Sequence, residues 1–182
     1  SDVCSSDLTS QSRIKMANRV GEATLNEAEL YGSMASIVLD RPYKGKNFAG
    51  AWRNILFNQF HDIIPGSCVI DSREHAMGLF QEAMALANSA KKRALLDFCN
   101  RIDTTGLFDQ EDARDTRSEG AGAGFGVEQF RVSQSSRGAG KTRVFHVFNS
   151  APYARTEVTE VVVWDWDYDL SRVCWQDASG NE

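Results

Sequence analysis

The chain has 182 residues, with 20 Lys and Arg against 25 Asp and Glu, so its formal net charge is −5. This acidic balance argues against a general nucleic-acid-binding protein, which normally presents a basic surface. No apolar run approaches the roughly 18–20 residues that a membrane-spanning helix requires. Because domains have roughly 100–200 residues, we expect one core or two small ones.

Residues 1–8 (SDVCSSDL) follow neither helical nor strand periodicity. They resemble the translated end of a sequencing adapter, and we interpret them as an artefact; the alternative is a genuine polar tail. Cys4 is therefore left out of the cysteine pattern. The remaining Cys68, Cys99 and Cys174 are widely spaced, which favours a reducing compartment and a cytoplasmic protein. Because we expect the true N-terminus to be missing, a signal peptide stays an open alternative.

Three helices are predicted next, over residues 9–39, 48–62 and 71–102. Thr9 or Ser10 would cap the N-terminus of the first helix. Pro65 and Gly66 would end the second helix. Asp71 would cap the N-terminus of the third helix. Short loops between such segments are typical of an antiparallel three-helix bundle. The inward face of the first helix steps by three and four through small side chains, which would let a neighbour approach closely: Ala17, Gly21, Thr24, Ala28, Tyr31, Ala35 and Val38. We expect a shared core of Trp52, Ile55, Phe80 and Met84.

The composition changes after residue 102. Residues 103–126 are acidic and rich in glycine, which is typical of a linker. Their GAGAGFG run follows no strand, so it is not a credible dinucleotide-binding loop. From residue 127 to 182, β-branched and aromatic runs at 143–148, 156–166 and 172–175 alternate with turns at 149–152 and 177–181.

The predicted fold class is therefore α+β, a three-helix bundle over residues 9–102 followed by the first strands of a β-sandwich domain. Two or three strands cannot close the core of such a domain. We accordingly expect that the chain is truncated at both ends.

One stretch, NQFHDIIPGS at residues 58–67, concentrates polar groups where the second helix is predicted to end. Consecutive helix residues point about 100° apart, so His61 and Asp62 face one point only if the helix ends there. They could present two groups to one pocket. Alternatively, His61 only interacts with the last carbonyls of its helix, and spacing alone favours this structural interpretation.

The longer string AWRNILFNQFHDIIPGS resembles the signature of the middle domain of glycoside hydrolase family 38, the α-mannosidases. SRIKMANRVGEATLNEAEL in the first helix is also similar to that family. VFHVFNSAPYARTEVTEV resembles the family's entry into its large β-domain. The resemblance covers most of residues 9–182 apart from the linker. With Phe60 where other branches have a second His, the motif resembles that of bacterial and cytosolic members.

The resemblance implies a metal-dependent retaining glycosidase acting on α-mannosides or mannose-containing oligosaccharides. It implies that His61 binds a divalent metal, most often zinc, and that Asp62 contacts sugar hydroxyls. Zinc accepts imidazole nitrogen and leaves positions for substrate oxygens. Retaining enzymes also need a nucleophile and an acid/base about 5–5.5 Å apart. The family supplies both from an N-terminal domain, so we expect no catalytic residue in this fragment and do not assign Asp62 as nucleophile.

Other candidates favour structural interpretations. Cys68 and His75 are spaced from His61 by sevens, but Pro65 and Gly66 break the helix between them. We therefore expect no local zinc site, and we expect Asp62 to point away from His61. His146 lies in a β run and is interpreted as core or surface. Four aromatic residues could stack on sugars, although packing is the simpler interpretation: Trp164, Trp166, Tyr168 and Trp175.

The competing hypothesis is a non-catalytic helical-bundle interaction module with a β tail, in which His61 only caps its helix. Under both hypotheses we expect no nucleic-acid or membrane partner. The sequence does not indicate an oligomeric state.

Overall fold

The computed structural model describes residues 11–107, 141–161, 163 and 168–181. The chain divides into two compact units, Ser1–Arg101 and Ile102–Glu182, which we describe separately. The suspected artefact at residues 1–8, most of the predicted linker and its glycine run, Trp164 and Trp166 lie outside the described residues.

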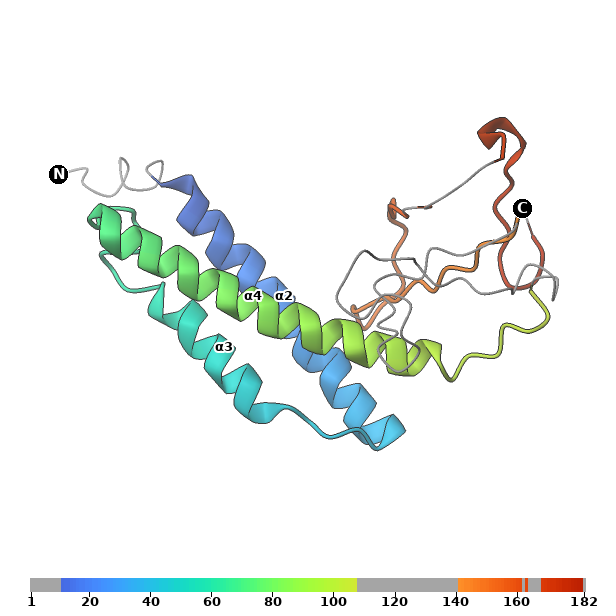
Figure 1. Ribbon diagram of the computed structural model, residues 1–182, viewed down its shortest axis with the longest axis horizontal. Coiled ribbons are helices and arrows are strands. Elements are labelled where there is room, and N and C mark those ends of the chain that lie inside the picture. The colour runs from blue at the N-terminus through green and yellow to red at the C-terminus, as the bar shows by residue number, and fades with distance from the viewer. Residues whose placement is uncertain (1–10, 108–140, 162, 164–167, 182) are drawn as a thin grey trace, which may run out of the picture. The chain divides into compact units, whose positions relative to one another are not determined.

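The first unit contains three helices in its described part: α2 (Ser12–Leu39), α3 (Gly45–Phe57) and α4 (Ile70–Cys99). Both α2 and α3 pack against α4, and α3 runs in the opposite sense to α2 and α4 (Figure 1). The predicted three-helix bundle is therefore confirmed. None of these helices is long and apolar enough to cross a membrane.

The helix boundaries differ from the prediction at both ends of the bundle. Gln11, with φ 49°, is the N-cap residue of α2 and makes no side-chain cap, whereas Thr9 and Ser10, which were expected to cap this helix, lie outside the described residues. Helix α3 begins at Gly45 rather than Phe48 and ends at Phe57 rather than Asp62. After Phe57 the amides of Gln59 and Phe60 donate to carbonyls three residues back. These tight turns replace the α-helical pattern before the His-Asp pair is reached.

The predicted small-residue face of α2 is largely confirmed, because most of its members are buried. Thr24 is half-buried and Val38 is exposed, while Leu25 adds a large side chain to the face. At Gly21 a Cβ atom would lie only 2.5 Å from Ile55 Cδ1 of α3. The absence of a side chain at Gly21 therefore sets how closely α2 and α3 approach. The buried residues of α2 are Ile14, Ala17, Asn18, Gly21, Leu25, Ala28, Tyr31 and Ala35.

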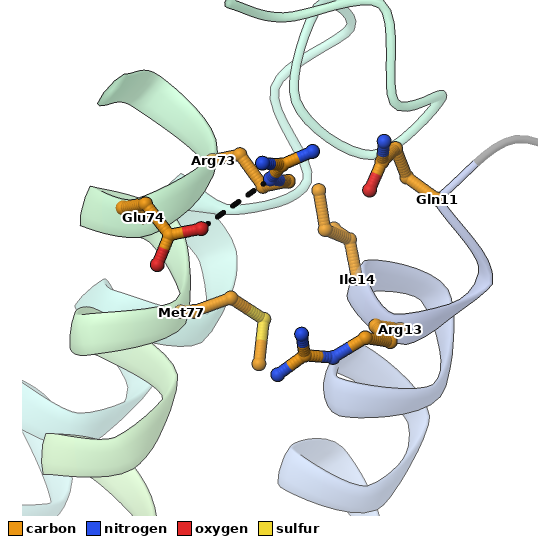
Figure 2. A pocket seen from close by; sticks show the side chains of 6 residues that line it. All are labelled: Gln11, Arg13, Ile14, Arg73, Glu74 and Met77. Atoms are coloured by element: carbon orange, nitrogen blue, oxygen red, sulfur yellow. Dashed lines mark ion pairs between the residues drawn. The ribbon is translucent and has the colours of Figure 1, made fainter. Parts of the chain in front are cut away.

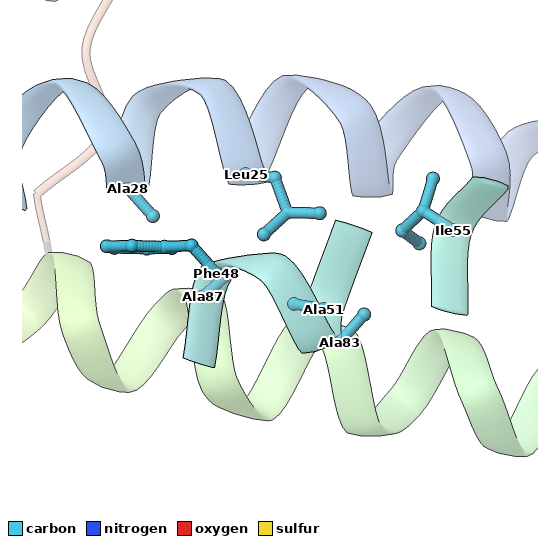
Figure 3. Packing of buried hydrophobic residues seen from close by; sticks show 7 residues of the cluster. All are labelled: Leu25, Ala28, Phe48, Ala51, Ile55, Ala83 and Ala87. Atoms are coloured by element: carbon cyan, nitrogen blue, oxygen red, sulfur yellow. The ribbon is translucent and has the colours of Figure 1, made fainter. Parts of the chain in front are cut away.

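Residues from all three helices form the main core (Figure 3). Ile55 is fully buried as predicted, and Trp52 and Phe80 pack at the edge of the cluster. Met84 is half-buried and is not in the cluster, so its predicted core position is wrong. Helix α4 contributes alanines instead, because their small side chains allow close approach to its neighbours. The buried residues of this cluster are Leu25, Ala28, Phe48, Ala51, Ile55, Ala83 and Ala87.

The second unit is described from residue 102 with gaps, and its described part contains one short 3-10 helix, η2 (Leu170–Arg172). The turns predicted near residues 149 and 177 are confirmed. Asn149 Oδ1 accepts from the amide of Ala151, and Asp177 Oδ1 accepts from the amides of Ser179 and Asn181.

The three predicted strands are not shown, because no described residue of the runs 143–148, 156–166 and 172–175 lies in a strand. A strand is defined by a ladder of hydrogen bonds to a neighbouring strand. The backbone hydrogen bonds given for the described part of this unit close turns instead.

Candidate functional site

His61 and Asp62 lie in the connection between α3 and α4, within residues 58–66, which we call the motif loop. Their side chains are 79% and 62% exposed, and His61 Nε2 lies 3.5 Å from Asp62 Oδ2. The expectation that Asp62 points away from His61 is therefore wrong. It assumed helical geometry, whereas α3 ends at Phe57. The turns that follow bring the imidazole and the carboxylate together at the surface.

An aromatic ring lies beside this pair. The ring centroids of Phe60 and His61 are 4.2 Å apart, with the planes tilted by 46°. Phe60 is itself half-exposed. The surface of the motif loop thus combines an apolar ring, an imidazole and a carboxylate, a combination that suits a ligand carrying both C–H faces and hydroxyl groups.

The beginning of the motif loop is attached to both long helices. Asn58 is 5% exposed, and its Nδ2 donates to the Ala76 carbonyl of α4 at 2.8 Å. Gln59 Nε2 donates to Glu22 Oε1 of α2 at 2.7 Å. The two amides that precede Phe60 in the motif therefore position the loop, and they leave the imidazole and carboxylate free to face outward.

The end of the motif loop is held by residues that sequence reasoning missed. Ile63 is 6% exposed and packs with Ile14 and Ala76 in a second buried cluster. Lys15 Nζ of α2 donates to the carbonyl of Pro65 at 2.9 Å. The apolar character of Ile63 was a usable signal for burial. Nothing in the local sequence around Lys15 indicates its partner, which lies fifty residues away.

Backbone hydrogen bonds make the loop itself compact. The amides of Ile63 and Ile64 donate to the Phe60 carbonyl at 2.9 and 3.0 Å. Gly66 donates to the Ile63 carbonyl at 3.0 Å and adopts φ 92°, a conformation that favours glycine. His61 and Asp62 are therefore carried on a tight turn and not on a helix end.

The other ligand candidates are not brought to His61. Cys68 packs against the second buried cluster, and His75 contacts Phe57 edge-on with ring centroids 6.0 Å apart. Among the described residues, no group of three or more His, Cys, Asp or Glu is arranged to hold a metal ion. The exposed imidazole and neighbouring carboxylate fit one edge of a zinc site, since both supply donor atoms that zinc accepts. A four-coordinate site would need further ligands.

A pocket of about 190 Å³ lies at the beginnings of α2 and α4 (Figure 2). In it Arg73 Nε lies 3.4 Å from Glu74 Oε1. Neither His61 nor Asp62 lines this pocket, so it does not contribute to the motif. Its lining residues are Gln11, Arg13, Ile14, Arg73, Glu74 and Met77.

The remaining candidates lie in the second unit. His146 is half-buried, and the Trp175 ring, which is exposed, lies 6.2 Å from that of Phe145. Tyr168 is partly exposed, with the Lys141 ammonium 5.8 Å from its ring centroid. These contacts join aromatic residues locally, and nothing in the described part gathers them into a sugar-stacking platform.

Comparison with known proteins identifies the first unit. A family profile described as "Alpha mannosidase middle domain" matches residues 5–97, which include the whole motif loop. The chain is 33% identical over 95 residues to human "Alpha-mannosidase 2C1", covering 50% of this chain and 9% of that protein. It is 36% identical over 63 residues to "Alpha-mannosidase" of Saccharomyces cerevisiae, covering 34% of this chain and 6% of that protein. No solved structure matches the chain. The chain thus matches less than a tenth of the length of these relatives.

Proposed function

Because the chain belongs to the alpha-mannosidase middle-domain family, we propose that it is part of a longer, metal-dependent retaining α-mannosidase. In this proposal the bundle presents His61 and Asp62 to an active site that another domain completes. The substrate class is an α-mannoside or a mannose-containing oligosaccharide. The observation that carries the proposal is the position of the His-Asp pair, exposed on an anchored loop within the matched region.

His61 is proposed to hold the metal through an imidazole nitrogen, a donor that zinc accepts, and zinc is the metal that the family resemblance implies. When bound, the metal would supply Lewis-acid stabilisation of the sugar oxygens. The His61 side chain is already exposed, so the imidazole can bind a metal without a prior change in the loop. The tilted Phe60 ring at 4.2 Å restricts the directions that the imidazole can take.

Asp62 is proposed to accept hydrogen bonds from sugar hydroxyls. A carboxylate accepts such bonds more strongly than a neutral group because its charge assists them. Its Oδ2 lies 3.5 Å from His61 Nε2, so a sugar oriented by Asp62 would also lie near the imidazole. The nucleophile and the acid/base are assigned to a domain outside this chain.

The metal and substrate roles are tested by substitution in the full-length protein. We expect His61→Ala to lose bound zinc, measured by mass spectrometry, and to lose turnover of an aryl α-mannoside. His75→Ala is the matched control, because His75 is another exposed histidine of the bundle that packs on Phe57 outside the motif loop. An active His61→Ala protein with normal zinc content would refute the ligand role and favour the non-catalytic interaction module.

A second substitution separates substrate binding from metal binding. We expect Asp62→Asn to keep its zinc and to lose about 10–100-fold in kcat/KM, since hydrogen bonds to charged groups contribute about 1.5–3 kcal/mol. Asp71→Asn makes the same change at an exposed carboxylate in the first turn of α4 and should leave kcat/KM unchanged. Equal effects of the two substitutions would contradict the assigned role of Asp62.

We also propose that residues 127–182 begin a β-domain and that the protein is cytoplasmic. The two confirmed turns bounding β-branched runs support the first proposal. The thiols of Cys68, Cys99 and Cys174 support the second, because none of them forms a disulfide among the described residues and unpaired thiols are typical of reducing compartments. Crystallography of the full-length protein and fractionation of cells that express it would test the two proposals.

A further inference from the structure

We propose that Lys15 is a positioning residue for the His-Asp pair: its ammonium fixes the end of the motif loop so that His61 and Asp62 face the same ligand. This inference rests on the proposed function for its catalytic consequence. It rests on the structure for the contact itself, in which Lys15 Nζ donates to the Pro65 carbonyl at 2.9 Å.

The motif loop has two ends, and they are held in different ways. At its beginning Asn58 and Gln59 donate to α4 and α2 respectively. At its end the residue before Gly66 is Pro65, whose nitrogen carries no proton and whose carbonyl therefore remains its only backbone hydrogen-bonding group. Lys15 donates to that carbonyl. The ammonium thus ties α2 to the end of the loop, as Gln59 ties α2 to its beginning.

The hydrogen bond from Lys15 to Pro65 lies three residues after the His-Asp pair, at the end of the turn that carries both side chains. Ile63, Ile64 and Gly66 donate backbone hydrogen bonds to carbonyls within the loop, and these bonds follow directly after His61 and Asp62. Ser67 Oγ also donates to the Asp62 carbonyl, at a long 3.4 Å. If the Pro65 carbonyl is released, the end of the turn that carries His61 and Asp62 loses this hydrogen bond to α2. The neighbouring Ile14–Ile63 contact is apolar and non-directional, so it holds the loop against the bundle without fixing its orientation.

Lys15→Met tests the inference because it keeps most of the aliphatic stem and removes the charged donor. Lys91→Met is the matched control. Lys91 Nζ of α4, also part-buried, donates to Glu27 Oε2 of α2 at the same distance of 2.9 Å, and neither residue belongs to the motif loop. Lys15→Arg restores a charged donor and should rescue the effects of Lys15→Met.

The first readout is hydrogen exchange in the 182-residue chain, which does not depend on enzymatic activity. We expect the amides of Ile63, Ile64 and Gly66 to exchange about tenfold faster in Lys15→Met, which corresponds to the loss of about 1.4 kcal/mol. In Lys91→Met these amides should keep the wild-type rate. Circular dichroism should show unchanged helix content in both variants. Unchanged exchange in Lys15→Met, or an equal increase in both variants, would overturn the inference.

The second readout is zinc affinity of the full-length protein, measured by competition with a chelator. We expect about tenfold weaker zinc binding for Lys15→Met, wild-type affinity for Lys91→Met, and recovery in Lys15→Arg. Faster exchange with unchanged zinc affinity would overturn the positioning role and leave a purely structural contact. A wild-type protein that binds no zinc would instead refute the proposed function of His61, and with it the catalytic part of this inference.

Discussion

At Gly21 the helices α2 and α3 come so close that a single methyl group has no room. A Cβ atom there would lie 2.5 Å from Ile55 Cδ1 and 3.2 Å from Ile55 Cγ1. Ile55 is fully buried, so it has little space into which to move. Gly21 therefore acts through packing, although glycine is otherwise unfavourable within a helix.

We predict that Gly21→Ala destabilises the bundle by about 1–3 kcal/mol, the usual cost of overpacking a core. Gly78→Ala in α4 is the control, since a Cβ there meets nothing within 4 Å. That substitution should stabilise the protein by up to about 1 kcal/mol through helix propensity. Urea unfolding of both variants measures the difference, and a stabilised Gly21→Ala protein would contradict the close approach.

Asn58 is the second residue whose replacement should measurably lower the stability of the bundle. Its Nδ2 donates to the Ala76 carbonyl, while its Oδ1 is buried and has no hydrogen-bond partner among the described residues. We predict that Asn58→Ala lowers the free energy of unfolding by about 1–2 kcal/mol, because a buried hydrogen bond is lost. Chemical denaturation followed by circular dichroism would measure this.

Asn54→Ala provides the comparison one turn earlier in α3. Asn54 Nδ2 donates to Glu82 Oε2 at 3.0 Å in an exposed position. Exposed substitutions usually change stability by less than about 0.5 kcal/mol. If both asparagine variants lost the same stability, the anchoring role of Asn58 would be wrong.

On the scale of elements, the short helix α3 depends on the connection that leads into it. Tyr43 in that connection donates from its hydroxyl to Glu29 Oε1 at 3.1 Å, and Trp52 Nε1 of α3 donates to Glu29 Oε2 at 2.8 Å. One carboxylate of α2 thus holds both the connection and the helix. Burial of the phenol, followed by its hydrogen bond to Glu29 and the negative charge there, raises the pKa of Tyr43 above its ordinary value.

This raised pKa predicts a loss of stability at alkaline pH. The neutral phenol is favoured in the folded state, so its contribution is complete below the unfolded pKa of about 10 and is lost as pH rises through the folded pKa. We predict that stability falls less steeply above about pH 10 in Tyr43→Phe than in the wild-type chain. Urea midpoints measured across this range would test it, and identical pH dependences would contradict the prediction.

On the scale of the whole molecule, the bundle presents its His-Asp pair outward and does not enclose it. Among the described residues, no cluster of three or more metal-ligating groups surrounds His61. Neither His61 nor Asp62 lines the pocket at the beginnings of α2 and α4.

We therefore predict that the 182-residue chain alone has no mannosidase turnover and binds zinc only weakly. A single imidazole leaves further ligand positions to be filled, and positioned proton transfer, typically contributing about 10²–10⁴-fold, is missing without the carboxylate pair. Calorimetric titration with zinc and a chromogenic α-mannoside assay would check both. Turnover that disappears in His61→Ala would instead place the complete site within this chain.

The helices and the face of α2 that packs inward could be predicted from the residue pattern alone. Apolar and small residues spaced by three and four must lie on one side of a helix, whatever the neighbours are. The motif at residues 58–67 also identified the family region before any geometry was known. These features are local in the chain, so local pattern was sufficient to find them.

The residue pattern did not predict where α3 ends, which face of α4 enters the core, or how the His-Asp pair is held, and the folded structure shows all three. Asn58 meets Ala76 eighteen residues later, and Lys15 meets Pro65 across fifty. Ala83 and Ala87 of α4 enter the core in place of Met84, because helices that pack closely need small side chains between them. The predicted strands likewise depend on partner strands for their hydrogen bonds. Contacts between distant residues set all of these features, and periodicity within a short window contains no information about such contacts.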